Sequence, residues 1–484
     1  MRLKKTILLI ALIMLMGTSN GLAGVNDSFG IGPKATALGQ AYTAYADDFS
    51  AMHYNPAGLT QMKGLNLTVG LQVTDIDYEQ TVNQTDFKYG ADPLDGTLST
   101  NNSDLLYVPQ IGLVYSPAGK RYAFGLGAYA PFGLHSWSDE NSSNFRYSAA
   151  EVYNNRIIYA APTFAYRIKD TLSLGLSVGM GYSDQGGLAQ LRIPGIEDRL
   201  NPILEGLYGP AATLPSGTGY ATTLGSMDID IDDTFNLSAN LGVLWNPKDW
   251  LSLGIAYRSE SKSEMEGTTT FTYSQTTRQL IESLGFPPPQ AVETLDTTMD
   301  FRHPQSLSFG TKIDITERFR LMFDLVWTDW SSRTEEIYAY DGDPTFLLLT
   351  AALGSGEPTD RLVIKRDWND TWEPHIGIEY QTLDWLALRF GYHYRPSNID
   401  KDTWDNMWPI IDYHIFSLGS GMVFEDRFTV DFAYSLLLGD DWDVKNGESR
   451  NLTADRILYS PYAGDEVEVE TTVHNFMIAI SYRF

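Results

Sequence analysis

Apolar and polar residues alternate with a period of two in several stretches of the chain, most clearly at its C-terminal end. From Phe476 to Phe484, every second residue is aromatic or branched aliphatic, while the residues between them form a small or polar face. The stretches 428–436, 386–395 and 319–328 repeat this pattern. Strands of about ten residues with such alternation are what a transmembrane β-barrel requires.

The connections between these stretches alternate in length. Very short turns are readable at 117–119, 169–170, 246–249, 316–317, 383–384 and 425–426. Long loops lie between them, at about 79–103, 132–154, 185–226, 274–296, 341–360, 396–410 and 446–465. Strands of a soluble β-sandwich also alternate, but its loops follow no such rule, whereas outer-membrane barrels have short periplasmic turns and long outer loops. We therefore predict an all-β fold, a transmembrane antiparallel barrel of about 14 strands.

The first residues have the pattern of an export signal. Basic residues at positions 2, 4 and 5 precede an apolar run that ends at Met16, and Gly21, Leu22 and Ala23 provide small residues near a cleavage site. This run is too short to span a bilayer. We therefore predict a signal peptide at 1–23, followed by an N-terminal segment at 24–62 and the barrel at 63–484.

Residues 24–62 lack the two-residue alternation. They mix small residues with isolated aromatic ones, and Ala35, Leu38, Tyr42 and Tyr45 have helical spacing. A disordered tail is the alternative, but the apolar content is high for solvated disorder, and Pro56 favours a turn after Asn55. A barrel of this width needs something to close its lumen. We expect this segment to be a hatch, a compact plug inside the barrel.

Several short segments of the chain are distinctive in sequence and position. LGQAYTAYADD and YNPAGL lie before the first strand, and the later segments are PFGL (131–134), LGIAYRSESKSEMEG (253–267) and WTDWS (327–331). In this combination the chain resembles the FadL/TodX family of outer-membrane transporters for long-chain fatty acids and aromatic hydrocarbons. The resemblance covers essentially the whole mature chain. It implies a fourteen-stranded barrel with an N-terminal hatch against its wall. The residues that we assign to the hatch and its gating are Asp47, Asp48, Asn55, Pro56 and Ala57.

Two of the long loops contain apolar residues at helical spacing, three and four apart. These helices either bury one another as a lid or form an apolar cleft that faces outward. The family resemblance implies a landing groove for substrate at this place, so we favour the cleft. Its candidate residues are Leu200, Ile203, Leu204 and Leu207 in the first loop and Leu280, Ile281, Leu284 and Phe286 in the second.

The third strand contains Pro131, Phe132 and Gly133 in its outer part. Proline cannot donate a hydrogen bond to a neighbouring strand, and glycine permits a bulge, so we predict a kink here. Alternatively, these residues simply begin the loop. The family resemblance implies that a kink opens a window through which substrate leaves sideways into the bilayer.

A fatty carboxylate needs a cationic partner inside the barrel. The alternation places Arg389, His393 and Arg395 in one lumen-facing row, and Arg333 lies elsewhere in the chain. Each of these side chains either contacts a headgroup or belongs to a lumen network with Asp324, Asp431 or the hatch acids.

Composition and motifs exclude several other classes of function. The formal net charge of −27 makes nucleic acid an unsuitable ligand, and the chain has no cysteine for disulfides or thiol chemistry. Gly175–Gly179 matches the hydrolase motif GxSxG, but it lies inside an alternating strand instead of at a strand-to-helix turn. Asp228, Asp230 and Asp232 fit a solvated strand extension, since no calcium loop surrounds them. The histidines lack metal-ligand spacing, so we predict no metal and no cofactor.

These observations favour a passive, hatch-gated channel for hydrophobic small molecules in the outer membrane of a Gram-negative bacterium. Long-chain fatty acids are the first substrate class, and aromatic hydrocarbons are the alternative. An outer-membrane hydrolase with its active site at the rim and an open general porin are the competing classes; neither explains the hatch. We expect a monomer that contacts outer-membrane lipid and is not an enzyme. We also expect the last strand, which ends in Phe484, to contact the outer-membrane assembly machinery.

Overall fold

The computed structural model describes residues 29–84, 98–102, 105–137, 151–191, 196–210, 213, 223–283, 287–352, 354–405, 408, 410–445, 447–452 and 465–484. The predicted signal peptide therefore lies outside the described residues. Within these ranges, no helix is both long and apolar enough to cross a bilayer.

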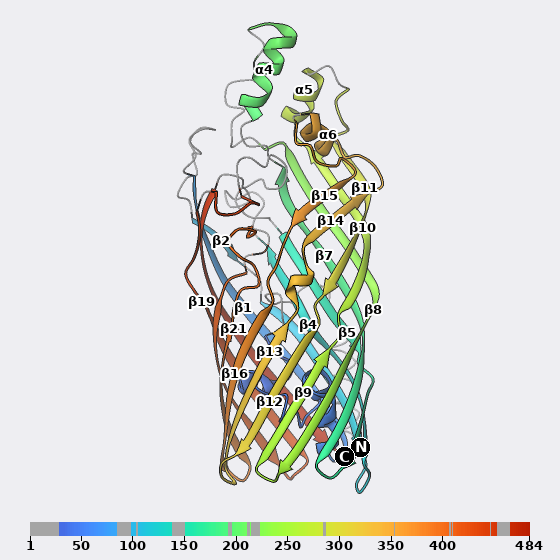
Figure 1. The fold of residues 1–484 in the computed structure, drawn as a ribbon, viewed down its shortest axis with the longest axis vertical. Helices are drawn as coiled ribbons and strands as arrows, with labels where there is room; N and C mark the ends of the chain where they lie inside the picture. The colour runs from blue at the N-terminus through green and yellow to red at the C-terminus, as the bar shows by residue number, and fades with distance from the viewer. Residues whose placement is uncertain are drawn as a thin grey trace.

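Most of the described chain forms one antiparallel sheet (Figure 1). Its strands are β1 (Gly64–Gln84), β2 (Leu98–Asn102), β3 (Leu106–Ser116), β4 (Tyr122–Trp137), β5 (Glu151–Ala160), β6 (Thr163–Lys169), β7 (Leu172–Leu191), β8 (Gly225–Lys248), β9 (Leu251–Arg258), β10 (Ser261–Tyr273), β11 (Val292–His303), β12 (Ser306–Asp314), β13 (Phe319–Thr328), β14 (Glu335–Tyr340), β15 (Arg361–Lys365), β16 (Thr371–Leu383), β17 (Leu386–Arg395), β18 (Tyr413–Phe424), β19 (Phe428–Gly439), β20 (Trp442–Val444) and β21 (Asp465–Arg483).

Several of these strands continue one another across a short interruption. Both β5 and β6, for example, pair with β4 on one side and with β7 on the other. When such segments are joined, the sheet is a closed barrel of 14 strands. Closure occurs where β1 pairs with β21, from Asn66 opposite Arg483 to Gln84 opposite Asp465. The predicted fold class and strand number are confirmed.

The strand faces follow the predicted alternation. In β21, Phe476, Ile478 and Ile480 face outward and are exposed, while Met477 and Ala479 are buried. All six predicted short turns lie between consecutive strands, each within a few residues of its predicted position. The last residue of the chain lies at the same end of the barrel as these turns (Figure 1). Aromatic and aliphatic side chains therefore face the lipid, and small or polar ones face the lumen.

Several strands are longer than the ten residues that the sequence predicts. β8 has 24 residues and β7 has 20, so the loop predicted at 185–226 is shorter than expected. A membrane-spanning strand needs only about 9–11 residues. The alternation continues beyond the membrane with polar residues facing outward, and Asp228 and Asp230 are exposed on this extension of β8. This is the solvated strand extension that the sequence predicts at Asp228, Asp230 and Asp232. For the end of β7, residues 185–191, the sequence instead predicts a loop.

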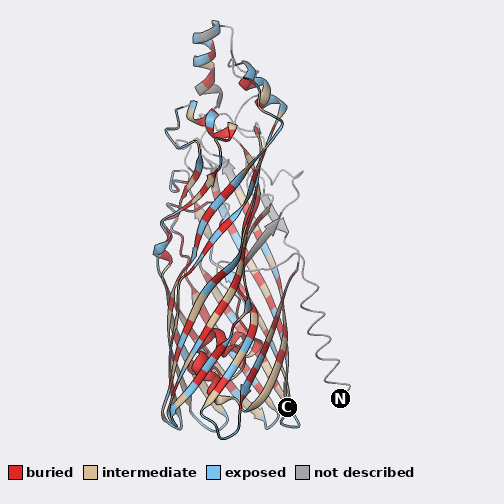
Figure 2. Ribbon diagram, turned by 90° about the vertical axis from the view of Figure 1, so that its right-hand side faces the viewer, coloured by how far each residue is buried: buried red, intermediate tan, exposed pale blue. Residues whose placement is uncertain are grey.

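The hatch, here the described residues 29–62, lies low inside the barrel as short helical turns (Figures 1 and 2). Its helices are α2 (Pro33–Ala37), α3 (Ala51–Tyr54) and η1 (Pro56–Gln61), and most of its residues are buried. The helical spacing predicted from Ala35 to Tyr45 does not form one helix. α2 ends at Ala37, and Gly39 and Gln40 have φ angles of 59° and 61°, which an α-helix does not allow.

Three more helices stand at the outer end of the barrel (Figure 1). They are α4 (Ile196–Tyr208), α5 (Gln275–Ser283) and α6 (Thr345–Ala352). The helical spacing in the two long loops correctly indicated α4 and α5. The sequence prediction missed α6, because nearly every residue in TFLLLTAA is apolar or small and no amphipathic pattern is present.

Candidate functional site: lumen cavity, hatch and wall kink

The lumen contains a cavity of about 70 Å³ above the hatch. At ~10–15 Å³ for each water, this space holds a few water molecules. Hatch residues form its floor, the predicted kink in β4 forms part of its side, and Trp330 of the short helix η4 (Trp330–Ser332) also lines it. The lining residues are Gln40, Thr43, His53, Tyr54, Pro131, Phe132, Arg156, Arg258, His303, Pro304, Ser306, Ser308, Val326, Thr328, Trp330, Glu373, His375 and Arg395.

Two arginines of this cavity have only neutral hydrogen-bond partners. Arg156 of β5 donates from Nε to Asn236 Oδ1 at 3.2 Å and from Nη2 to Ser261 Oγ at 2.8 Å. Arg258, at the end of β9, donates from Nη2 to His53 Nε2 of the hatch at 2.8 Å. Within the described part of the chain, neither guanidinium forms an ion pair with a carboxylate. The cavity therefore carries positive charge that the described wall does not neutralise. Neither arginine was predicted as a headgroup partner from the sequence.

The four predicted headgroup partners lie in different surroundings. Arg389 pairs with Glu379 at 2.8 Å and with Asp431 at 2.6 Å, so two wall carboxylates already neutralise it. The ring of His393 stacks on the ring of His375 with centroids 4.6 Å apart. Arg333 pairs with Glu336, and its guanidinium lies between the rings of Phe301 and Trp368. Of the four, only Arg395 lines the cavity, where it pairs with Glu373 at 3.2 Å.

The predicted hatch residues Asn55, Pro56 and Ala57 contact the barrel wall directly. Asn55 Oδ1 accepts a hydrogen bond from Ala57 N, which caps the N-terminus of η1. Asn55 Nδ2 donates to the carbonyl oxygens of Thr43 and Val243 at 2.7 and 3.0 Å, and Val243 belongs to β8. One asparagine side chain thus joins two parts of the hatch and attaches them to the wall.

The two acidic hatch residues act within the hatch itself. Asp47 pairs with Lys34 at 2.6 Å and accepts a hydrogen bond from the Tyr42 hydroxyl at 2.8 Å. Asp48 accepts hydrogen bonds from the backbone N and the hydroxyl of Ser50. Both carboxylates therefore stabilise the compact form of residues 34–50.

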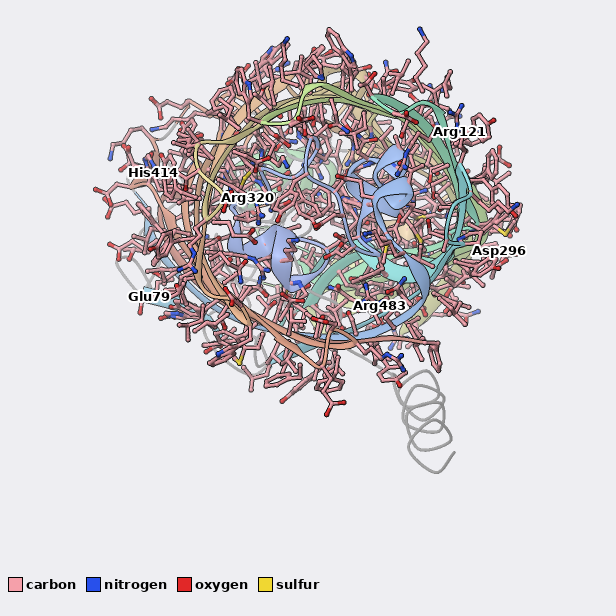
Figure 3. All side chains as sticks on the ribbon, turned by 90° about the horizontal axis from the view of Figure 1, so that it is seen from below. Glu79, Arg121, Asp296, Arg320, His414 and Arg483 are labelled. Atoms are coloured by element: carbon pink, nitrogen blue, oxygen red, sulfur yellow. The ribbon has the colours of Figure 1, made fainter. Side chains whose placement is uncertain are left out.

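Wall side chains hold the hatch backbone at several further points. Asp324 Oδ2 accepts hydrogen bonds from the backbone N of Tyr42 and Thr43 at 2.9 and 2.7 Å. Glu379 accepts a hydrogen bond from the Tyr45 hydroxyl at 2.7 Å and also pairs with Arg320 and Arg389. Figure 3 shows the hatch inside the ring of strands from below, with Arg320 labelled on the wall beside it.

A ring of wall glycines faces the hatch. At each of them, an added Cβ would lie less than 3.0 Å from a hatch atom: Gly112, Gly125, Gly127, Gly175, Gly242, Gly254, Gly310, Gly377, Gly391 and Gly419. The closest approach is 1.9 Å, from the position of a Cβ on Gly391 to the backbone N of Gly39. Gly175 is the first glycine of the GxSxG match, and its nearest hatch atom is Ala57 N. This glycine ring lets the hatch backbone lie directly on the strands.

The predicted kink lies within a strand, because β4 continues to Trp137 and contains Pro131, Phe132 and Gly133. β4 pairs with β3 only between Phe124 and Ala128, although β3 extends outward to Leu106 and remains paired there with β1. On its other side, the register against β5 shifts between Tyr129 and Phe132. β4 thus leaves β3 at the height of the cavity. Residues 129–133 are all buried, so the normal in-out alternation is lost there.

The predicted landing residues lie in and around an apolar cluster at the outer end. Leu200, Leu204 and Leu280 are buried in one cluster with Phe346, Leu347 and Leu349 of α6. Ile281 is also buried, whereas Ile203 is 41% exposed. The side chain of Leu207, together with Leu284 and Phe286, lies outside the described residues. In the described part of the chain, no group of three or more metal-ligating side chains is present.

The sequence matches one protein family over residues 25–484, the family described as outer membrane protein transport protein (OMPP1/FadL/TodX). The long-chain fatty acid transport protein of Escherichia coli is 21% identical over 425 residues, which cover 86% of this chain and 87% of that protein. Alkane uptake protein A of Marinobacter nauticus is 22% identical over 476 residues, with 97% and 93% covered.

A solved structure has the same fold. The crystal structure of a Pseudomonas aeruginosa FadL homologue superposes with a TM-score of 0.74 at 19% identity, covering 96% of this chain and all of that one. Together with the family match across nearly the whole sequence, the closed 14-strand barrel establishes that the chain belongs to the OMPP1/FadL/TodX family of outer-membrane transport proteins.

Proposed function

We propose that this protein is a passive channel, closed at its lower end by the hatch, for hydrophobic molecules that carry a carboxylate, with long-chain fatty acids as the substrate class. The cavity above the hatch is the internal binding site, and its arginines receive the headgroup. Burial of the acyl chain supplies the driving force, at roughly 0.8 kcal/mol for each methylene removed from water. No energy source is needed for such downhill transfer.

The observation that carries this proposal is the pair Arg156 and Arg258. Both line the cavity, and neither has a carboxylate partner in the described part of the chain. An unpaired buried charge is costly, so a ligand that neutralises it binds with a large electrostatic contribution. A carboxylate provides two oxygens for such charge-assisted hydrogen bonds, and a hydrocarbon provides none. The name of the E. coli relative, a long-chain fatty acid transport protein, agrees with this substrate class.

A neutral hydrocarbon is the second candidate substrate, and the aromatic side of the cavity favours it. The ring of Phe132 lies 4.9 Å from that of His303 and 6.1 Å from that of Trp330, which gives an apolar surface without a charge requirement. The M. nauticus relative is named an alkane uptake protein. Substrates of this kind make contact with the rings but leave Arg156 and Arg258 uncompensated.

The route that we propose has an entrance at the outer helices and an exit at the kink. The apolar cluster around α4, α5 and α6 is the landing region, and Ile203 is an exposed contact on it. From the cavity, the ligand leaves between β3 and β4, where pairing stops at Ala128. This exit delivers an oily molecule to lipid without contact with periplasmic water. The hatch, held by Asn55 and its neighbours, meanwhile keeps the lower lumen closed.

The test compares two ligands of equal chain length, oleate and the neutral hydrocarbon 9-octadecene. We expect oleate to bind more tightly and Arg156→Met to weaken oleate binding by ~1.5–3 kcal/mol, roughly 10- to 150-fold, while octadecene binding is unchanged. The matched control is Arg302→Met, which removes an arginine 54% exposed on the outside of the barrel. Titration calorimetry in detergent measures both ligands. Equal affinities that Arg156→Met leaves unchanged would favour the neutral hydrocarbon.

Two expectations about partners accompany this proposal. A single chain contains the complete cavity and a closed sheet, so we expect a monomer. The C-terminal strand ends with outward-facing aromatic residues, and the rings of Tyr482 and Phe484 lie 4.9 Å apart. We propose that this end of β21 is the contact for the outer-membrane assembly machinery.

A further inference from the structure

The connection between β17 and β18 is described at residues 396–405, 408 and 410–412, and most of these residues are buried. Its described residues include Ile399, Trp404 and Ile411, which are at most 1% exposed, and Trp408, which is 2% exposed. These side chains belong to one apolar cluster with residues of β1, β3, β4, β5, β7, β18, β19 and β21, strands from different sides of the barrel. An outer loop with these contacts lies across the lumen, on the outer side of the cavity.

Buried ion pairs attach this segment to the wall. Arg366, which is 1% exposed, donates to Asp405 at 2.5 Å and to Glu336 of β14 at 2.7 Å. Glu336 also pairs with Arg333. Two backbone carbonyls of the segment accept hydrogen bonds from another connection: Thr403 O from Asn451 Nδ2 at 2.6 Å, and Trp404 O from the Ser449 hydroxyl. These ion pairs and hydrogen bonds hold the segment in its closed position.

A continuous chain of aromatic contacts joins the segment to the kink in β4. The ring of Trp408 lies 6.2 Å from that of Trp368, which lies 5.5 Å from that of Trp330. Trp330 in turn lies 6.1 Å from Phe132. Trp330 and Phe132 both line the cavity, and Phe132 is on the edge where β4 has left β3.

We infer that the described residues of this connection, 396–405, 408 and 410–412, are an outer plug, a second closure of the lumen, which an incoming acyl chain displaces to enter the cavity. Because Trp408 connects through Trp368 and Trp330 to Phe132, displacement of the outer plug also loosens the packing that fills the window between β3 and β4. Entry from outside and exit to the side are then coupled, while the hatch stays in place. The inference rests on the proposed function in its choice of ligand.

The absence of cysteine from the sequence makes a direct test possible. Thr403→Cys places a thiol in the outer plug at a residue with 0% exposure, and Ala37→Cys does the same in the hatch. Ser331→Cys provides an exposed control. In proteoliposomes, we expect a water-soluble maleimide to label the Thr403→Cys protein slowly at rest and about tenfold faster with oleate, within the usual coupling range of ~5–150-fold. Labelling of Ala37→Cys should stay slow, and that of Ser331→Cys should stay fast.

A second variant weakens the attachment of the plug without any ligand. Asp405→Asn keeps the size of the side chain but removes the charge that Arg366 contacts, so labelling of Thr403→Cys should rise severalfold with no oleate present. Heat-modifiable migration in gel electrophoresis checks that the barrel is folded. Two results would overturn the outer plug: fast labelling of Thr403→Cys at rest, or oleate transport with no change in its labelling. If the unmodified protein neither binds nor transports oleate, the proposed function is wrong, whatever the labelling shows.

Discussion

The hatch and the outer plug close the same lumen in different ways. At the hatch, backbone lies against backbone: a Cβ on Gly391 would be 1.9 Å from Gly39 N, and Asp324 binds two hatch N–H groups. At the outer plug, the contacts described above each involve a side chain: Asn451 and Ser449 donate to the carbonyls of Thr403 and Trp404, and a Cβ on Gly439 would lie 2.5 Å from Ile411 Cδ1, the far end of a flexible side chain. Backbone contacts fix one position, whereas aromatic and aliphatic contacts can repack. The comparison indicates a rigid lower closure and an adaptable upper one.

The largest expected effect is the loss of the lower closure altogether. Deletion of residues 24–60 removes the hatch, and we expect the nearly closed channel to show a large, steady ion conductance in planar bilayers. Without the hatch, the side-chain contacts of the outer plug should repack and open often enough to let small ions pass. A large conductance in the intact protein would contradict the hatch, and a closed channel after deletion would show that the outer plug seals by itself.

The next largest effect comes from removing one carboxylate at each closure and comparing the ion conductance. Glu379→Gln leaves Arg320 and Arg389 with one carboxylate fewer beside the hatch, and breaking a buried pair of this kind costs about 3–5 kcal/mol. We expect frequent channel openings and a lower unfolding temperature. In the upper region, Asp405→Asn should leave conductance low. Similar conductance in both variants would remove the distinction between the closures.

Glycine substitutions compare the contacts directly. Gly391→Ala forces a Cβ against hatch backbone, and overpacking of this kind costs ~1–3 kcal/mol. In Gly439→Ala, the new Cβ contacts the flexible end of the Ile411 side chain, which can repack. We therefore expect the free energy of unfolding to fall by less than ~1 kcal/mol. Gly206→Ala in α4 is the control without a clash, because a Cβ there has nothing within 4 Å, and it should raise the free energy of unfolding by up to about 0.5–1 kcal/mol through helix propensity alone. Urea unfolding in lipid vesicles measures all three, and an equal loss at positions 391 and 439 would argue against a rigid lower closure.

The smallest effect concerns the aromatic chain of the outer plug. Trp408→Leu removes one ring contact with Trp368, and such aromatic pairs contribute about 0.5–1.5 kcal/mol. We expect slightly faster oleate uptake into vesicles with no change in ion conductance. Slower uptake would indicate that Trp408 guides the ligand and does not obstruct it.

The sequence contains most of the barrel in readable form, because lipid on one side and a polar lumen on the other impose a period of two. It also indicates where the hatch contacts the wall. Gly391 lies in a lumen-facing row with Arg389 and His393, and glycine at such a position is typical of close approach by another chain segment. The extension of β8 at Asp228, Asp230 and Asp232 was predicted, whereas that of β7 at 185–191 was assigned to a loop, because its glycines and polar residues are compatible with either.

The cavity could not be assembled from sequence. Arg156 and Arg258 are on β5 and β9, and only strand order and register bring them to one cavity. Arg389 and Arg395 have the right type and face, but nothing in the pattern reveals that Glu379 and Glu373 neutralise them. Charge pairing across strands is a property of the closed sheet. Only the structure therefore separates the arginines that are already paired with a carboxylate from those that are free to bind an anion.

The long strands have a consequence for where cargo is collected. A strand of 24 residues exceeds the membrane requirement of about 10 by enough to raise its tip roughly 25 Å or more above the bilayer at a tilt of ~45°. The long strands place α4, α5 and α6 at the end of the barrel far from the short turns (Figure 1). The landing region that we propose therefore meets hydrophobic molecules well outside the bilayer, and the barrel wall shields them from water on the way to the lumen cavity.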